Sequence, residues 1–329
     1  MHEASRMYIS QVHWVFSLNA GHAGSTFLGN LSNYRTGSEG EGLCGIFEGG
    51  HSFRDSVVCK DSPPPQHGCG IAGWWKGVVL AADTETDNDD NAWAWEIKRR
   101  NKEVTTEVSA AEEKKAAADL FVERCMLPVY LRQLRACQGD HATLPGTFLD
   151  IGHHVLFGLL YPLIDFLPHV TVVRIRRPRV MNAMSYFEEG KIPCNGRGMF
   201  VLCPWWHDAV LRPTQDQWEQ LSGFQRCLWM IDEVEARWQL LRKRRPEAVG
   251  PALNWTDGDS IQDARQVIAG LLSGRPSAGP IDKQRQHLDA EWEEKHQDLL
   301  ESIPELLEDY DHKMNFTSRQ RRMISEQQF

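Results

Sequence analysis

Two kinds of segment alternate along this chain, and they differ in the spacing of their apolar positions. A β-branched and aromatic run predicts a buried strand at 12–18, and further short runs predict strands at 78–82, 147–151, 170–175 and around 251–255. Amphipathic spacing of apolar positions predicts helices at 215–243 and 281–312, an Ala-, Glu- and Lys-rich composition predicts one at 105–127, and 153–167 is an apolar, helix-like segment. Strands that alternate with helices favour a central parallel sheet with helices on both faces, so we expect an α/β fold.

We expect residues 1–329 to form a single domain, with two segments that depart from this alternation. The segment 36–75 is rich in Gly, Pro and Ser, which predicts an irregular insertion of the length that often carries function. The segment 281–329 predicts a C-terminal helical extension, with Pro304 as a candidate break. We expect its last residues, around Arg319, Arg321 and Arg322, to be frayed.

The charge balance narrows the range of partners. The chain carries a net charge of −9, which argues against general nucleic-acid binding. No apolar run reaches the ~18 residues of a membrane span, and Met1–Ser10 has no apolar core of the kind a signal peptide needs. We therefore expect a cytoplasmic protein without a membrane span, and its oligomeric state stays open.

The eight cysteines include no Cys-x-x-Cys pair. Cys44, Cys59 and Cys69 lie near His51 and His67, but these spacings match no standard zinc pattern. We favour free thiols over a disulfide and a disulfide over a metal site, and we predict no bound metal.

A glycine turn follows the first predicted strand and precedes an apolar segment. This order of strand, glycine turn and helix start is the layout of a phosphate-binding loop, in which backbone N–H groups and the helix dipole hold an anion. The Lys of the usual Gly-Lys-Ser/Thr ending is missing. The turn consists of Gly21, His22, Ala23, Gly24, Ser25 and Thr26.

A cluster of arginines ends the strand predicted at 170–175. Its members are Arg174, Arg176, Arg177 and Arg179, and the helix that follows Pro178 carries Ser185. For two of the four arginines we expect ordinary surface ion pairs. Ligands of an open parallel sheet bind beyond the carboxyl ends of its strands, where this cluster and the glycine turn both lie. Two such elements suggest a ligand with two separated anionic groups.

These motifs resemble the sulfotransferases that use 3′-phosphoadenosine 5′-phosphosulfate (PAPS). That family has a phosphate-binding loop without the Gly-Lys-Ser/Thr ending, and an Arg followed eight positions later by a Ser, as Arg177 is by Ser185. The stretches "FLDIGHHVLF" and "WMIDEVEARW" resemble the plant and algal branch. The resemblance covers roughly 10–35 and 145–275. It implies a P-loop fold and transfer of a sulfuryl group from PAPS to a hydroxyl of a carbohydrate or small alcohol.

The resemblance also implies roles for single residues. The glycine turn would hold the 5′-phosphosulfate, and Arg177 and Ser185 would hold the 3′-phosphate. His153 would be the catalytic base, with His154 one residue out of phase and Asp150 a candidate to orient the imidazole. His22 stands where the family has a Lys or Arg that neutralises the leaving group, so its protonation would matter for catalysis.

Two alternatives stay open. The first is a nucleotide-binding protein of the same fold with weak or no catalysis, favoured by His22 and by the lack of a clear third nucleotide loop. The second is a P-loop kinase, which the missing Lys and the lack of a clear acidic magnesium ligand at a strand end disfavour. The resemblance places the acceptor site in 36–75 and 192–208. Trp74, Trp75, Trp205 and Trp206 offer either stacking surfaces for an acceptor or anchors of these loops in the core.

Overall fold

The structure is a computed structural model, and the account below concerns the residues that it describes. These are 9–20, 43–46, 119, 122–127, 130–131, 147–150, 153–156, 158–194, 202–204, 209–254, 266–267, 270 and 297–324. The glycine turn, the strand predicted at 78–82 and most of the segment 36–75 lie outside them.

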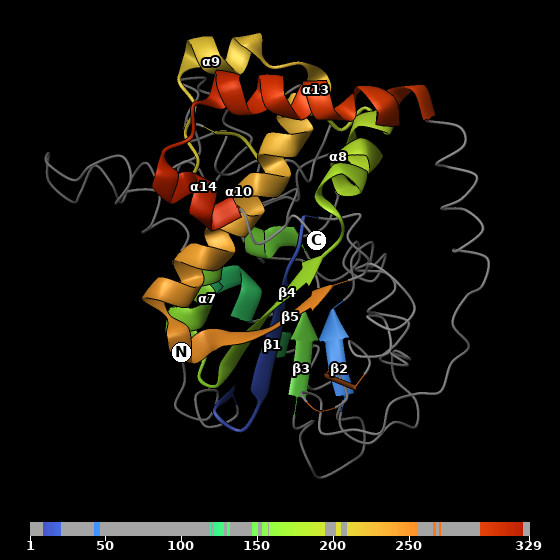
Figure 1. The fold of residues 1–329 in the computed structure, drawn as a ribbon. Helices are drawn as coiled ribbons and strands as arrows, with labels where there is room; N and C mark the ends of the chain where they lie inside the picture. The colour runs from blue at the N-terminus through green and yellow to red at the C-terminus, as the bar shows by residue number, and fades with distance from the viewer. Residues whose placement is uncertain are drawn as a thin grey trace, which may run out of the picture.

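The centre of the fold is a five-stranded sheet with the order β2-β3-β1-β4-β5, in which every pair of neighbours is parallel. In Figure 1 the arrows of β2, β3 and β4 point toward the same edge of the sheet. The strands are β1 (His13–Leu18), β2 (Leu43–Ile46), β3 (Thr147–Asp150), β4 (Val170–Arg176) and β5 (Val249–Asn254). The sheet confirms the predicted α/β class with parallel strands.

Four of these strands lie where the sequence predicts them, and β2 does not. Leu43–Ile46 falls inside the segment predicted as irregular, so that prediction is wrong for these four residues. The stretch Leu-Cys-Gly-Ile is short and has a glycine in its interior, and it lacks the β-branched and aromatic run that marks β1 and β4. Its parallel pairing with β3 is a tertiary contact that no local pattern announces.

The core is built around β1. From Trp14 to Leu18 every residue is buried, and because successive side chains point to opposite faces, both faces of the sheet are covered at this strand. The ring of Trp14 packs against Phe148 and Tyr130, with centroids 5.1 and 5.6 Å apart. This packing holds β1 and β3 together beneath the carboxyl edge of the sheet.

Helices follow the strands and form a further layer at the C-terminus. Between β3 and β4 lie η3 (His153–Leu156) and α7 (Leu160–Phe166), and α8 (Arg179–Glu188) begins just beyond β4 (Figure 1). The other helical elements are η2 (Val122–Met126), α9 (Gln215–Gln220), α10 (Gly223–Arg244), η4 (Pro246–Ala248), α13 (Gln297–Met314) and α14 (Ser318–Ile324).

The single helix predicted at 215–243 is two helices, α9 and α10, each of which begins with its own capping box. Thr214 caps α9 with Gln217, and Ser222 caps α10 with Gln225. The extended backbone of Ser222 separates them. The tryptophans of this segment are buried, as predicted: Trp218, Trp229 and Trp238.

The C-terminal layer is more regular than the sequence predicts. Helix α13 continues through Pro304, with Ile303 and Tyr310 buried against the rest of the fold. The expectation of frayed residues around Arg319 is wrong, because these residues form α14. Thr317 and Gln320 cap its start, with the Gln320 N–H donating to the Thr317 hydroxyl at 3.2 Å.

Candidate anion-binding site

The carboxyl ends of β1 and β4 lie side by side at a topological switch point. The chain leaves β1 for β2 on one side of the sheet and leaves β4 for β5 on the other side. In open parallel sheets such a point is where ligands bind. Leu18 at the end of β1 is paired in register with Arg174 of β4. The segments that follow these two strands are the glycine turn and the arginine cluster.

The structure places some of the predicted site residues at this edge. Arg177 follows β4 directly and Ser185 lies in α8, and both are partly exposed. His153 and His154 begin η3, shortly after β3. All of these segments leave the same edge of the sheet. The residues of the glycine turn, His22 included, are not among those that the structure describes.

A buried tyrosine joins the two halves of this edge. The Tyr186 hydroxyl donates a hydrogen bond to the backbone carbonyl of Ala20, 166 residues away in the sequence. Both residues are buried. Ala20 immediately precedes Gly21, and Tyr186 immediately follows Ser185. The bond therefore holds Ala20, just beyond the end of β1, next to the helix that carries Ser185, a link that the sequence did not reveal.

Two arginines of the cluster share one buried carboxylate of α10. Glu235 accepts hydrogen bonds from Arg174 Nε at 3.2 Å and from Arg176 Nε and Nη2 at 3.1 and 2.5 Å. The Glu235 side chain is fully buried, and those of Arg174 and Arg176 are 2% and 14% exposed. Arg174 also donates to the carbonyl oxygens of Leu18 and Ile175. Glu235 thus ties α10 to the ends of β1 and β4.

A third arginine of the cluster fixes the start of α8. Arg179 donates through Nε and Nη2 to the two carboxylate oxygens of Asp232, each at 2.7 Å. The Tyr310 hydroxyl of α13 donates to the same carboxylate at 3.0 Å, and its ring lies 5.5 Å from the Arg179 guanidinium carbon. Asp232 therefore joins α8, α10 and α13.

These contacts correct the expectation of two surface ion pairs. The partners of Arg174, Arg176 and Arg179 are buried carboxylates rather than surface groups. The apolar pattern of 215–243 hid these partners, because Asp232, Glu233 and Glu235 lie among buried apolar residues of α10. The third acid, Glu233, accepts from Arg237 at 2.7 Å and from the backbone N–H groups of Val210 and Leu211.

Burial and the neighbouring opposite charges act in opposite directions on the pKa values of Arg174 and Glu235. Burial lowers the pKa of Arg174 to about 10, against the opposing effect of Glu235, and the guanidinium therefore stays charged at neutral pH. Burial alone would raise the pKa of Glu235, but Arg174 and Arg176 outweigh it and hold this pKa below its ordinary value of 4.5. Glu235 is consequently ionised at neutral pH and balances part of the arginine charge.

Asp150 is the last residue of β3 and is paired in register with Phe16 of β1. Its carboxyl group is buried and has a buried partner, Tyr130. Its Oδ2 accepts a hydrogen bond of 2.5 Å from the Tyr130 hydroxyl. Burial and the neighbouring Asp150 raise the pKa of Tyr130 well above 10. The role predicted for Asp150 was to orient the His153 imidazole, whose placement lies outside the described side chains. Asp150 is also an acidic strand end, which weakens one of the two arguments against a kinase.

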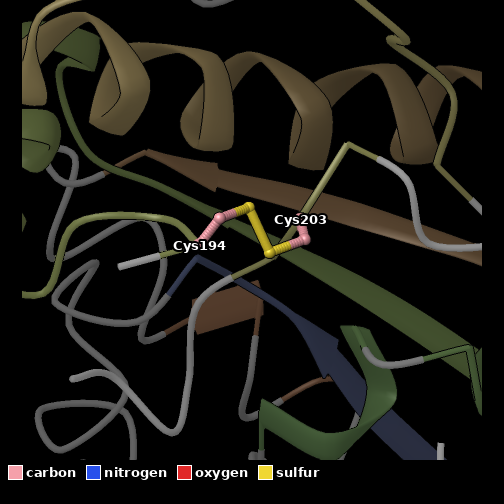
Figure 2. The surroundings of a disulfide bond; sticks show 2 residues. All are labelled: Cys194 and Cys203. Atoms are coloured by element: carbon pink, nitrogen blue, oxygen red, sulfur yellow. A yellow bond between two sulfur atoms is a disulfide. The ribbon is translucent and has the colours of Figure 1, made fainter. Parts of the chain in front are cut away.

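The prediction that free thiols are favoured over a disulfide is wrong for one pair of cysteines and holds for Cys227. Cys194 and Cys203 form a disulfide, with their Cα atoms 5.5 Å apart (Figure 2). The bond lies within the segment 192–208 that the resemblance assigns to the acceptor site, while Trp205 and Trp206 are outside the described residues.

Cys227 is a free, buried thiol, and burial raises its pKa to about 12. Within the described parts of the chain, no group of three or more His, Cys, Asp or Glu residues is arranged to hold a metal.

Comparison of this chain with known protein families, curated proteins and solved structures finds no match. Where the structure describes helices, none has both the length and the apolar character needed to cross a bilayer.

Proposed function

We propose that this protein is a PAPS-dependent sulfotransferase of the P-loop type, which transfers a sulfuryl group to a hydroxyl of a carbohydrate or small alcohol. The observation that carries the proposal is the bond from Tyr186 to Ala20 at the switch point of the sheet. It supports a single ligand that reaches both the glycine turn and the helix of Ser185. PAPS has the two separated anionic groups that such a site would take.

The two anionic groups would be held by different means. Arg177 offers a planar fork to the 3′-phosphate, and Ser185 adds a hydroxyl donor. Arg177 is partly exposed in the segment between β4 and α8. Asp232 and Glu235 hold the neighbouring Arg174, Arg176 and Arg179 in place. The 5′-phosphosulfate would lie at the backbone N–H groups of the glycine turn, with Ser25 and Thr26 as hydroxyl donors.

In the proposed reaction the acceptor oxygen attacks the sulfur, and the bond from sulfur to the bridging phosphate oxygen breaks. The leaving group is adenosine 3′,5′-bisphosphate. His153, at the start of η3, would take the acceptor proton, a form of help typically worth ~10²–10⁴ in rate. His22, when protonated, would stabilise the charge that develops on the leaving phosphate.

The decisive experiment is calorimetry with adenosine 3′,5′-bisphosphate, 5′-AMP and ATP. The parent should bind the bisphosphate more tightly than 5′-AMP. Arg177→Ala should weaken bisphosphate binding by roughly ten- to a hundredfold, because a hydrogen-bonded charge pair is lost, and should leave 5′-AMP binding nearly unchanged. Arg242→Ala, at an exposed position near the end of α10, is the control for losing one positive charge. Equal losses for both ligands would show that Arg177 does not read the 3′-phosphate.

Turnover separates the proposal from its alternatives. With PAPS and a panel of carbohydrates and alcohols, the parent should release the bisphosphate, and His153→Ala should lower this rate strongly while nucleotide affinity stays the same. Bisphosphate binding without turnover on any acceptor would favour the nucleotide-binding alternative. A preference for ATP, with phosphate transfer in the presence of magnesium, would favour the kinase.

A further inference from the structure

Asn182 of α8 carries a buried polar atom that the fold does not use. The residue is 1% exposed, and its side-chain Oδ1 is buried without a hydrogen-bond partner. Buried acceptors in native proteins are nearly always hydrogen-bonded, because an unpaired one has lost its water and gained nothing in return. An exception therefore points to a donor that is not part of the chain, such as an ordered water in the free protein and a ligand group in the complex.

The position of Asn182 shows where that donor would come from. Asn182 precedes Ser185 by three residues and Tyr186 by four, and residues at these spacings share one side of a helix. Tyr186 reaches the carbonyl of Ala20 at the end of β1. Asn182 therefore lies on the side of α8 that faces the switch point, and Phe187 is exposed on another side.

The chemistry of the atom limits the ligand group that can satisfy it. An amide oxygen accepts hydrogen bonds only, and so it needs an O–H or N–H and repels a phosphate. In adenosine 3′,5′-bisphosphate the 3′ and 5′ oxygens are esterified, which leaves the 2′-hydroxyl as the one donor on the ribose. This hydroxyl is on the carbon next to the one that bears the 3′-phosphate.

We propose that Asn182 is a ligand-binding residue whose Oδ1 accepts a hydrogen bond from the ribose 2′-hydroxyl of the bound nucleotide. The inference rests on the proposed function, since it takes the 3′-phosphate to lie at Arg177 and Ser185. The site would then recognise two features of the nucleotide. Arg177 and Ser185 would donate to the 3′-phosphate, and Asn182, one helical turn before Ser185, would accept from the ribose. Ribonucleotides are then preferred over deoxyribonucleotides.

The test combines a change in the protein with the matching change in the ligand. Calorimetry compares adenosine 3′,5′-bisphosphate with its 2′-deoxy analogue, in the parent and in Asn182→Leu, which has a similar shape and no polar atom. The parent should bind the deoxy analogue about three- to tenfold more weakly, as expected for one lost neutral hydrogen bond. Asn182→Leu should bind the bisphosphate more weakly by a similar factor and should no longer distinguish the two ligands.

Stability separates this role from a structural one. Because Oδ1 has no partner in the free protein, Asn182→Leu should melt at the same temperature as the parent or higher. Met184→Leu, a buried change of similar size on another side of α8, should leave both affinities unchanged. If Asn182→Leu fails to fold, Asn182→Ala replaces it.

Three results would overturn the inference. A parent that binds both ligands equally has no group that reads the 2′-hydroxyl. If Asn182→Leu still binds the deoxy analogue more weakly than the bisphosphate, by the same factor as the parent does, a group other than Asn182 recognises the 2′-hydroxyl. No bisphosphate binding by the parent would refute the proposed function together with this inference, whereas binding without the coupling would refute the Asn182 assignment alone.

Discussion

Removal of the Glu235 carboxylate should destabilise the fold strongly, because two arginines depend on it. Glu235 is fully buried and bonds Arg174 and Arg176 at 3.2 and 2.5 Å. In Glu235→Ala, Arg174 would keep only backbone carbonyls as partners, at 2% exposure. Breaking one partner of a buried ion pair typically costs about 3–5 kcal/mol. Arg176 is 14% exposed and can recover some hydration, so we expect a total within that range rather than twice it.

The measurement is urea unfolding followed by tryptophan fluorescence, for which the buried Trp14 and Trp229 are suitable reporters. A loss of about 3–5 kcal/mol would be a large part of the ~5–15 kcal/mol that stabilises a typical domain. Glu219→Ala, an exposed glutamate on α9, is the matched control and should change stability by less than about 0.5 kcal/mol. If Glu235→Ala costs less than about 1 kcal/mol, the pair behaves like a surface ion pair and the reasoning is wrong.

The same carboxylate gives a prediction for pH. The pKa of Glu235 is depressed in the folded state, so its contribution is present above its ordinary value of 4.5 and is lost as pH falls through the lower, folded value. Glu235→Gln keeps the shape but does not titrate. The stability gap between parent and Glu235→Gln should therefore be constant at neutral pH and shrink below pH 4.5. A gap that stays constant in acid would show that the pKa is not depressed.

Three further predictions concern single contacts. Tyr310→Phe removes one of the donors to the Asp232 carboxylate, which keeps Arg179, and should lower the free energy of unfolding by about 1.5 kcal/mol in urea titrations; no change would show that the contact is incidental. Ser222→Ala removes the N-cap of α10 and should cost about 1 kcal/mol by the same assay, whereas a neutral change would mean that packing alone starts this helix. Peptide mapping after alkylation should find Cys194 and Cys203 cross-linked until a reductant is added, and their alkylation without reductant would contradict the disulfide.

The parts of the fold that the sequence predicted are those whose signal is local. The runs that became β1 and β4 are apolar, rich in β-branched or aromatic residues and largely buried, and burial on both faces requires such runs. β5, with the sequence Val-Gly-Pro-Ala-Leu-Asn, is less buried and has a weaker local signal. β2 has no such run and depends on pairing with β3. The break between α9 and α10 did have a local signal, since Ser222 and Gln225 form a capping box, but the continuous apolar spacing outweighed it.

The site shows the same division between local and distant causes. The arginine cluster was visible in the sequence because its members lie within six residues of one another. The sequence did not reveal which of these arginines pair with acids, because Asp232 and Glu235 lie 53 to 61 residues further along the chain. The bond from Tyr186 to Ala20 spans 166 residues and has no motif. The assignments of the glycine turn and of His153 stay predictions.

The charge of this ion network bears on how the site selects its ligand. Arg174, Arg176 and Arg179 contribute three positive charges, and Asp232 and Glu235 contribute two negative ones, which leaves one positive charge in a chain whose net charge is −9. Arg177, directly after β4, adds a further positive charge at the same edge. If the site binds PAPS as proposed, a triphosphate would gain only a limited advantage there from charge alone. The buried acids of α10 hold β4 and α8 in place and cancel part of the arginine charge, so discrimination would depend on donors and acceptors at fixed positions.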